Sequence, residues 1–243
     1  VLKKKELSMD ALKAPSKCGL IKSLVQHEVN ELIYRMQRIL SSSKGAYVRP
    51  FEWDVPKSIK ANKILELAKQ LNHPEILNHG LRSFAFGKIL MRLSGEKVDD
   101  EVFFAGSLLH DLGLMRDCTG SSFELVGANE ACEHCEEIFE KRDLEVLYEM
   151  ILLHDAIGMA SDKSLELKYL HYGAGIDVAD LWTHRISVEN YKEVYNKYPS
   201  HNHIEFMISL LKQRLNENPK MYLSTLMKLG FTRKMRKHQS LKL

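Results

Sequence analysis

Apolar residues recur at three- and four-residue intervals along most of the chain, which is the spacing of one face of an α-helix. The first such stretch lies between Leu20 and Leu40, and a loop-type run of Ser, Lys and Gly follows it at residues 41–45. Later stretches with the same period span residues 58–71, 74–94, 99–109, 124–142, 144–154, 165–182, 204–216 and 220–229. No run alternates apolar and polar residues for long enough to predict a strand. The pattern therefore predicts an all-α fold.

Helix-breaking and capping residues sharpen some of these boundaries. Gly95 predicts the end of the 74–94 helix, and Asp99 or Asp100 is a suitable N-cap for the next one. Pro50 and Pro56 flank residues 51–53, which we expect to be extended.

Three parts follow from this pattern: an N-terminal helical extension at 1–45, a main helical domain at 46–230 and a C-terminal tail at 231–243. The loop around residues 41–47 is the best boundary between the first two. The tail is basic and contains no acid: its charged residues are Arg233, Lys234, Arg236, Lys237 and Lys242. We expect a solvated or frayed tail, with binding of phosphate or of a partner as the alternative.

Composition adds few constraints. With 44% hydrophobic residues, the 243-residue chain can bury a sizeable core. The net charge of +3 is too small to predict nucleic-acid or membrane binding, and no apolar run approaches the roughly 20 residues of a membrane span. The 4 Cys residues do not form a disulfide framework in a chain of this length, and the start lacks the apolar core of a secretory signal. We expect a cytoplasmic protein.

Four residues of metal-ligand type occur in apolar surroundings: His79, the adjacent pair His110 and Asp111, and Asp177. Each alone is more often a surface or packing residue, but together they would be costly to bury without a shared cation. Two imidazoles and two carboxylates without a thiolate suit Zn²⁺, Fe²⁺, Mn²⁺, Co²⁺ or Ni²⁺. A helical bundle can bring such distant positions onto facing helices, and an ion with an open position activates water. The combination predicts a metal site.

The order His, His-Asp, Asp resembles the HD-domain superfamily of metal-dependent enzymes, and the surrounding segments resemble its cyanamide-hydratase-like branch. The matching segments are LNHGLRSFAFG (77–87), DDEVFFAGSLLHDLGL (99–114), SFELVGANEA (122–131), ILLHDAIGMA (151–160), HYGAGIDVAD (171–180) and EVYNKYP (193–199). This resemblance implies an HD-type helical bundle over 46–230. It also implies that His79, His110, Asp111 and Asp177 bind one divalent ion, with Zn²⁺ as the first expectation.

In that branch a metal-activated water adds across the nitrile of cyanamide and gives urea, so the resemblance implies a hydro-lyase. It places Glu124 and His154 in the pocket as proton-handling residues, beside Asp111. A neutral His can carry a proton near pH 7. The alternatives are that Glu124 is a helix-capping acid and that His154 makes only a structural hydrogen bond. Family members tend to carry Arg where this chain has Ser200, which leaves the substrate range open.

Two other functions stay open: a metal-dependent phosphohydrolase acting on a nucleotide or other phosphomonoester, and a non-catalytic HD module. Phosphoryl transfer benefits from Lys or Arg beside the ion. The candidates are Arg82, Lys88, Arg92 and Arg116, of which only Arg82 is well placed. The complete ligand set disfavours the non-catalytic module. We expect one ion, a small-molecule substrate, no nucleic-acid or membrane partner, and a possible homo-oligomer.

The remaining chemistry-bearing residues have ordinary interpretations. Cys132 and Cys135 have CxxC spacing but no second pair, so we expect neither a zinc site nor a redox role. Arg82 is expected in a buried ion pair on the same helix face as His79. We expect the following to be packing or surface residues: Trp53, Trp182, His171, His184, His201 and His203.

Overall fold

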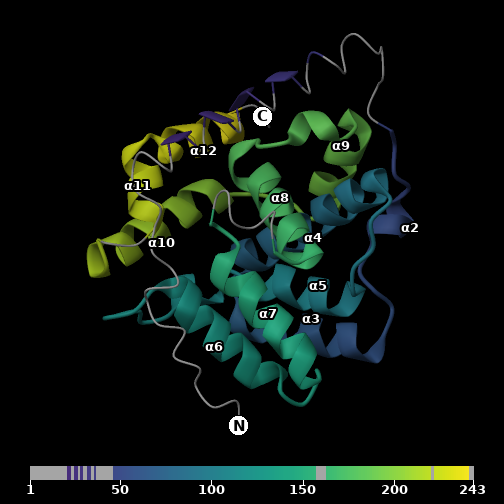
Figure 1. The fold of residues 1–243 in the computed structure, drawn as a ribbon, viewed down its shortest axis with the longest axis horizontal. Helices are drawn as coiled ribbons and strands as arrows, with labels where there is room; N and C mark the ends of the chain where they lie inside the picture. Colours follow the sequence, from purple (N-terminus) through teal and green to yellow (C-terminus); the bar gives the residue numbers. More distant parts are fainter. Residues whose placement is uncertain are drawn as a thin grey trace.

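A computed structural model of the chain describes residues 46–156, 163–219 and 222–240, with residues 21–22, 25–26, 28–29, 32–33 and 36 of the N-terminal part. These described residues contain helices and connecting turns but no strand (Figure 1). The all-α prediction is confirmed for them. The described N-terminal positions are helical with exposed side chains, while the rest of the predicted extension lies outside the described residues.

The helices follow one another through short connections (Figure 1). In chain order they are α2 (Pro50–Trp53), α3 (Ile59–Leu71), α4 (Pro74–Ser94), α5 (Asp100–Leu109), η2 (Leu112–Met115), α6 (Phe123–Cys135), α7 (Lys141–Leu153), α8 (Leu165–Ala179), η4 (Thr183–Arg185), α9 (Val188–Lys197), α10 (His203–Glu217), α11 (Tyr222–Lys228) and α12 (Phe231–Ser240).

Capping residues set several of these helix ends. The Asp99 carboxylate accepts hydrogen bonds from the backbone N–H groups of Glu101 and Val102, as the sequence predicted for the start of α5. Gly95 ends α4 with φ of 70°, a left-handed conformation that glycine adopts without a steric penalty. Ser side chains cap α3, α6, α8 and α9 in the same manner as Asp99.

The most extensive packing in the molecule is between α4 and α8. A Cβ atom at Gly173 of α8 would lie 2.0 Å from the carbonyl oxygen of Ser83 on α4, so only glycine permits this approach. The two helices run antiparallel, because Gly173 meets Ser83 while Asp177, one turn later, meets His79 one turn earlier. This close crossing brings two of the predicted site residues together.

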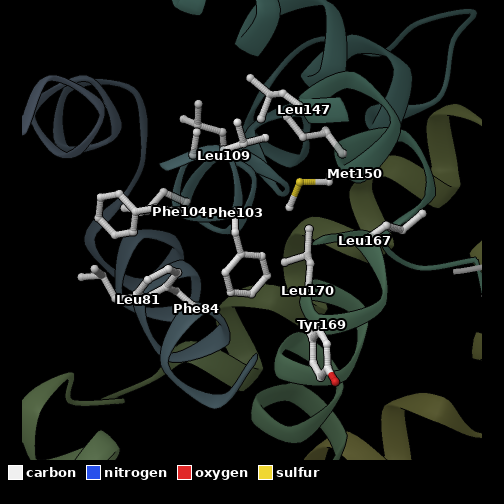
Figure 2. Packing of buried hydrophobic residues seen from close by; sticks show 14 of the residues in the cluster. Leu81, Phe84, Phe103, Phe104, Leu109, Leu147, Met150, Leu167, Tyr169 and Leu170 are labelled. Carbon is white, nitrogen blue, oxygen red and sulfur yellow. The ribbon is translucent and has the colours of Figure 1, made fainter. Parts of the chain in front are cut away.

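The main core is built from aromatic and aliphatic side chains of α3 to α8. Figure 2 shows Phe103 of α5 between Phe84 of α4 and the side chains of Met150 and Leu170. The ring centroids of Phe84 and Phe103 lie 5.4 Å apart. Phe104 makes an edge contact with Phe84, with ring centroids 5.0 Å apart. Aromatic pairs at such distances stabilise a core beyond the area that they bury.

Buried residues of α10, α11 and α12 contribute to a second, smaller hydrophobic core. Met235 of α12 is fully buried there, and Arg236 forms an ion pair with Glu205 of α10. The expectation of a frayed tail is therefore wrong for residues 231–240. The cause is that an apolar position lies within the basic run and packs against the bundle.

Three further predictions of local structure need correction. Residues 51–53 form the short helix α2 because Pro50 occupies its first position, where no N–H donor is needed. The stretch predicted as one helix over 124–142 ends at Cys135, and the buried Phe139 lies in the turn before α7. The helix predicted over 165–182 ends at Ala179, because Asp180 adopts a left-handed conformation with φ of 56°. Helix α9 was not predicted.

Among the described residues, no helix has the length and apolarity to cross a membrane.

The contact at Gly173 can be tested by substitution. We expect Gly173→Ala to lower the free energy of unfolding by about 2–3 kcal/mol, because the added methyl group forces α8 away from α4. Urea denaturation measures this loss. Ala174→Gly at the next position of the same helix is the control, with an expected cost of about 1 kcal/mol from helix propensity alone. A loss at Gly173 no larger than that of the control would show that the crossing is not tight.

Candidate metal centre

The predicted site residues are brought together where several helix ends meet. His79 lies inside α4, His110 and Asp111 directly follow α5, and His154 directly follows α7. The other two are Glu124, in the first turn of α6, and Asp177, near the end of α8. All six side chains are buried, with no more than 6% of any residue exposed. The C-terminal ends of α5 and α7 carry partial negative charge, which favours a cation between them.

His110 and His154 are held in the same manner. In each, Nδ1 faces a carbonyl oxygen of the preceding helical turn, at 2.8 Å from Ser107 O for His110 and 2.7 Å from Ile151 O for His154. A carbonyl oxygen only accepts hydrogen bonds, so Nδ1 carries the proton in both residues. In a neutral imidazole this tautomer leaves Nε2 with a free lone pair.

The ring of His79 is oriented by the carboxylate of Asp177. Its Nδ1 lies 2.7 Å from Oδ2 of Asp177, while its Nε2 points toward His110. The guanidinium of Arg82 binds both oxygens of Asp177 at 2.7 and 2.9 Å. This keeps Asp177 ionised and able only to accept hydrogen bonds. Nδ1 of His79 is therefore the donor, and in the neutral ring Nε2 of His79 carries the lone pair.

Three acceptor atoms consequently converge on one point. Nε2 of His79 lies 3.1 Å from Nε2 of His110. Oδ2 of Asp111 lies 3.4 Å from the former and 3.3 Å from the latter. Burial lowers the pKa of His110, which keeps this ring neutral. Lone pairs that face one another in a buried space repel unless a cation lies between them.

The spacing fits a single metal ion. Atoms bound to one ion at about 2.0–2.2 Å, with angles of about 90–110°, lie about 2.8–3.6 Å from each other. The separations of 3.1, 3.3 and 3.4 Å fall in this range. His79, His110 and Asp111 would thus form one face of a coordination sphere and leave further positions open for water or substrate.

The two carboxylate oxygens of Asp111 face different neighbours. Oδ2 faces the two imidazole nitrogens, and Oδ1 lies 3.5 Å from Nε2 of His154. Burial by itself would raise the pKa of Asp111, but the neighbouring imidazoles of His110, His154 and His79 hold it well below its usual range. Asp111 is therefore a carboxylate, as a metal ligand must be.

His154 is the basic neighbour of this carboxylate. Burial opposes its protonated form, but the hydrogen bond to Asp111 and the negative charge of Asp155 raise the pKa of His154 to about 9. At neutral pH it is an imidazolium whose Nε2–H points at Oδ1 of Asp111. It can thus hold a proton beside the centre.

Glu124 forms a carboxyl pair with Asp155, a residue that the sequence interpretation did not assign to the site. Burial and the charge of Asp155 raise the pKa of Glu124 to about 8, so it is largely protonated at pH 7. Its Oε2 is buried without a hydrogen-bond partner among the described residues, and so is Oδ2 of Asp155. Buried orphan oxygens of this kind are suited to a bound water or a substrate group.

Asp177 lies on the far edge of the His79 ring from the three convergent atoms. His79 and Asp177 also form a second possible ligand set with His203. In that set Oδ2 of Asp177 lies 3.6 Å from Nε2 of His203. The guanidinium of Arg82 already neutralises this carboxylate, which disfavours a cation there. The buried ion pair expected of Arg82 is confirmed.

His203 and His171 lie near the site. The sequence interpretation expected both to be packing or surface residues and assigned neither of them to the site. His203 is fully buried and stacks on His79, with ring centroids 4.9 Å apart. Nδ1 of His171 lies 2.7 Å from the carbonyl oxygen of His154. His203 lies in none of the matching segments, and His171 begins the segment 171–180 but has no assigned role there. The packing of α8 and α10 places both residues beside the site. Cys132 and Cys135 are free, buried thiols whose pKa burial raises to about 12, which is unsuited to redox chemistry.

No protein-family model matches this sequence, and the curated proteins include no match to it.

The raised pKa of Glu124 predicts a pH-dependent stability. This carboxyl ionises near 4.5 in the unfolded chain but near 8 in the folded one, so it costs stability progressively as pH rises between these values. Glu124→Gln cannot ionise. We expect this variant and the parent to differ little near pH 4.5, and the variant to gain about 4 kcal/mol relative to the parent by pH 8.

Urea denaturation across this pH range, with a chelator present, measures the gain without a contribution from bound ions. Glu133→Gln changes an exposed carboxylate on the same helix and should give a difference that is flat with pH. A flat difference for Glu124→Gln would instead mean that Glu124 is ionised in the folded protein.

Proposed function

We propose that this chain is a metal-dependent enzyme of the HD type that adds water to a small nitrile-type substrate, with cyanamide to urea as the model reaction. The observation that carries the proposal is the convergence of three acceptor atoms from His79, His110 and Asp111 within 3.1–3.4 Å of each other. Their ligand chemistry suits Zn²⁺ first, with Fe²⁺, Mn²⁺, Co²⁺ and Ni²⁺ as other occupants.

The burial of the centre supports a small substrate. The three metal-facing residues are 1–5% exposed, and Glu124 and His154 are hardly more open. A nitrile of a few atoms would need little room there, and it requires only one ion and one or two proton-handling groups. A nucleotide would need room for a base, a sugar and a charged phosphate.

The basic residues support the same choice over phosphohydrolysis. Asp177 and the carbonyl oxygens of Tyr198 and Pro199 accept four hydrogen bonds from the guanidinium of Arg82. Lys88 pairs with Asp100, and Arg116 pairs with Glu130 at 2.7 Å. These cations are therefore engaged elsewhere, whereas phosphoryl transfer requires donors aimed at the transferred group.

The bound ion would supply an acidified water and polarise the nitrile. The residues of this chain handle the rest of the reaction. Addition of water breaks one π bond of the nitrile, forms one C–O bond and transfers one proton to the nitrile nitrogen. The second water proton then moves from oxygen to that nitrogen as the imidic acid rearranges to urea. His154, protonated below a pKa of about 9, donates a proton to that nitrogen. The carboxyl pair of Glu124 and Asp155 accepts the water proton and returns it to His154. Asp111 orients His154 through Oδ1.

The test is urea release from cyanamide by the purified protein, with and without a chelator. We expect chelator-sensitive urea formation that is lost in His110→Ala and Asp111→Ala, together with loss of the one bound metal ion per chain measured by elemental analysis. His134→Ala removes an exposed His from α6 and should keep both. Metal-loaded, folded protein that releases no urea would refute the hydratase proposal, and hydrolysis of a phosphomonoester by it would support the alternative. Absence of any bound metal would refute the metal centre.

Substitution of His154 separates proton transfer from metal binding. We expect His154→Ala to keep the ion, because its Nε2 faces the second oxygen of Asp111, and to reduce kcat by about 10²–10⁴-fold. Steady-state kinetics on protein with measured metal content gives the answer. An unchanged kcat would exclude His154 as the proton donor.

A further inference from the structure

Asp177 is the residue with the largest number of polar contacts around the centre. Its Oδ1 accepts from Nε of Arg82 and from the hydroxyl of Tyr195. Its Oδ2 accepts from Nη2 of Arg82 at 2.9 Å and from Nδ1 of His79 at 2.7 Å. A carboxylate has about four lone-pair positions, so these four donors saturate it.

The surroundings of Asp177 oppose direct coordination of an ion. Its side chain is fully buried, so a donor that it releases cannot turn to water. An ion bound to Oδ2 would also lie beside the guanidinium of Arg82, where like charges repel. The convergent nitrogen of His79 is Nε2, on the ring edge away from Asp177.

The same contacts fix the ring of His79. The hydrogen bond from Nδ1 to Asp177 sets the tautomer, and the ring of His203 stacks on it at 4.9 Å with an interplanar angle of 21°. Arg82 extends the arrangement, because its Nη1 donates to the carbonyl oxygens of Tyr198 and Pro199 at 3.1 and 2.9 Å. These two residues begin the connection that leads to His203 on α10.

We propose that Asp177 is a positioning residue and not a metal ligand: with Arg82, Tyr195 and His203 it holds His79 so that the Nε2 lone pair faces the ion. This inference rests on the proposed metal centre, and it departs from the ligand set that the resemblance implies. A carboxylate behind a metal-binding His orients the ring and raises its basicity. The centre then has three protein ligands.

Metal binding distinguishes the two roles. If Asp177 is a positioning residue, Asp177→Asn should still bind one Co²⁺ per chain with about 10–100-fold lower affinity. The visible spectrum of the bound Co²⁺ should be unchanged, because that spectrum reports the coordinating atoms. Tyr195→Phe removes only one of the four donors and should cause a smaller loss. Tyr198→Phe on the same α9 end, where only the backbone carbonyl contacts Arg82, is the matched control with unchanged affinity.

Two results would overturn the inference. One is loss of the ion in Asp177→Asn as complete as in Asp111→Ala. The other is a Co²⁺ spectrum that changes in intensity and position, which would indicate a lost ligand. If Asp177→Asn does not fold, the change in affinity and the unchanged spectrum of Tyr195→Phe decide the question.

The tautomer of His79 provides a test that needs no metal. Nitrogen-15 NMR of the metal-free parent protein should show a protonated Nδ1 and a bare Nε2 on His79, and Asp177→Asn should shift the equilibrium toward the other tautomer. A proton on Nε2 in the parent would contradict the positioning role. If the parent protein binds no metal but shows this tautomer, the proposed function fails and the positioning role stands.

Discussion

The repulsion among three lone pairs is the constraint on which the interpretation of this molecule depends. His79, His110 and Asp111 present unprotonated atoms to one another at 3.1–3.4 Å inside the bundle. The second nitrogen of each imidazole is already committed as a donor, so a change of tautomer cannot relieve the contact without breaking a buried hydrogen bond. A cation is the simplest addition that makes the cluster favourable, and these ligand types suit the divalent transition metal proposed above.

The helical scaffold supplies the donors that enforce this arrangement. His110 and His154 each follow the last turn of a helix and use a carbonyl oxygen of that turn as the partner of Nδ1. Such carbonyl groups lack an intrahelical partner, so the histidines satisfy the helix end and are oriented by it at once. The adjacent residues Asp111 and Asp155 then face the same interior. The same local arrangement thus occurs twice, once for the pair of the proposed metal centre and once for the pair that we propose to handle protons.

The charged groups differ between the two sides of the centre. Behind His79, the Arg82 guanidinium neutralises Asp177 and ties α4 to α8 and to the end of α9. On the other side, His154 faces Asp111, and the charge of Asp155 helps to keep it protonated. Burial raises the pKa of Glu124 to about 8, so Glu124 also carries a proton at pH 7. On the first side, four donors hold the carboxylate of Asp177 in place. On the second side, His154 and Glu124 carry protons that can be transferred. This division matches a reaction in which water adds and one proton is transferred.

Much of this could be predicted from the sequence by itself. Apolar periodicity, with signals such as Asp99 and Gly95, determined the helical class and most helix boundaries, because these depend on neighbours a few residues away. The His-Asp pair of the proposed centre could be named for the same reason, because a His-Asp pair after an apolar run is a local feature. Glu124 and His154 were named through the resemblance to a known family. Only the tertiary structure decided which edge of His79 faces which partner, that His203 and Asp155 belong to the surroundings of the centre, and that Met235 anchors the basic C-terminal segment. Those relations join residues distant in sequence, and packing between helices such as α4 and α8 creates them.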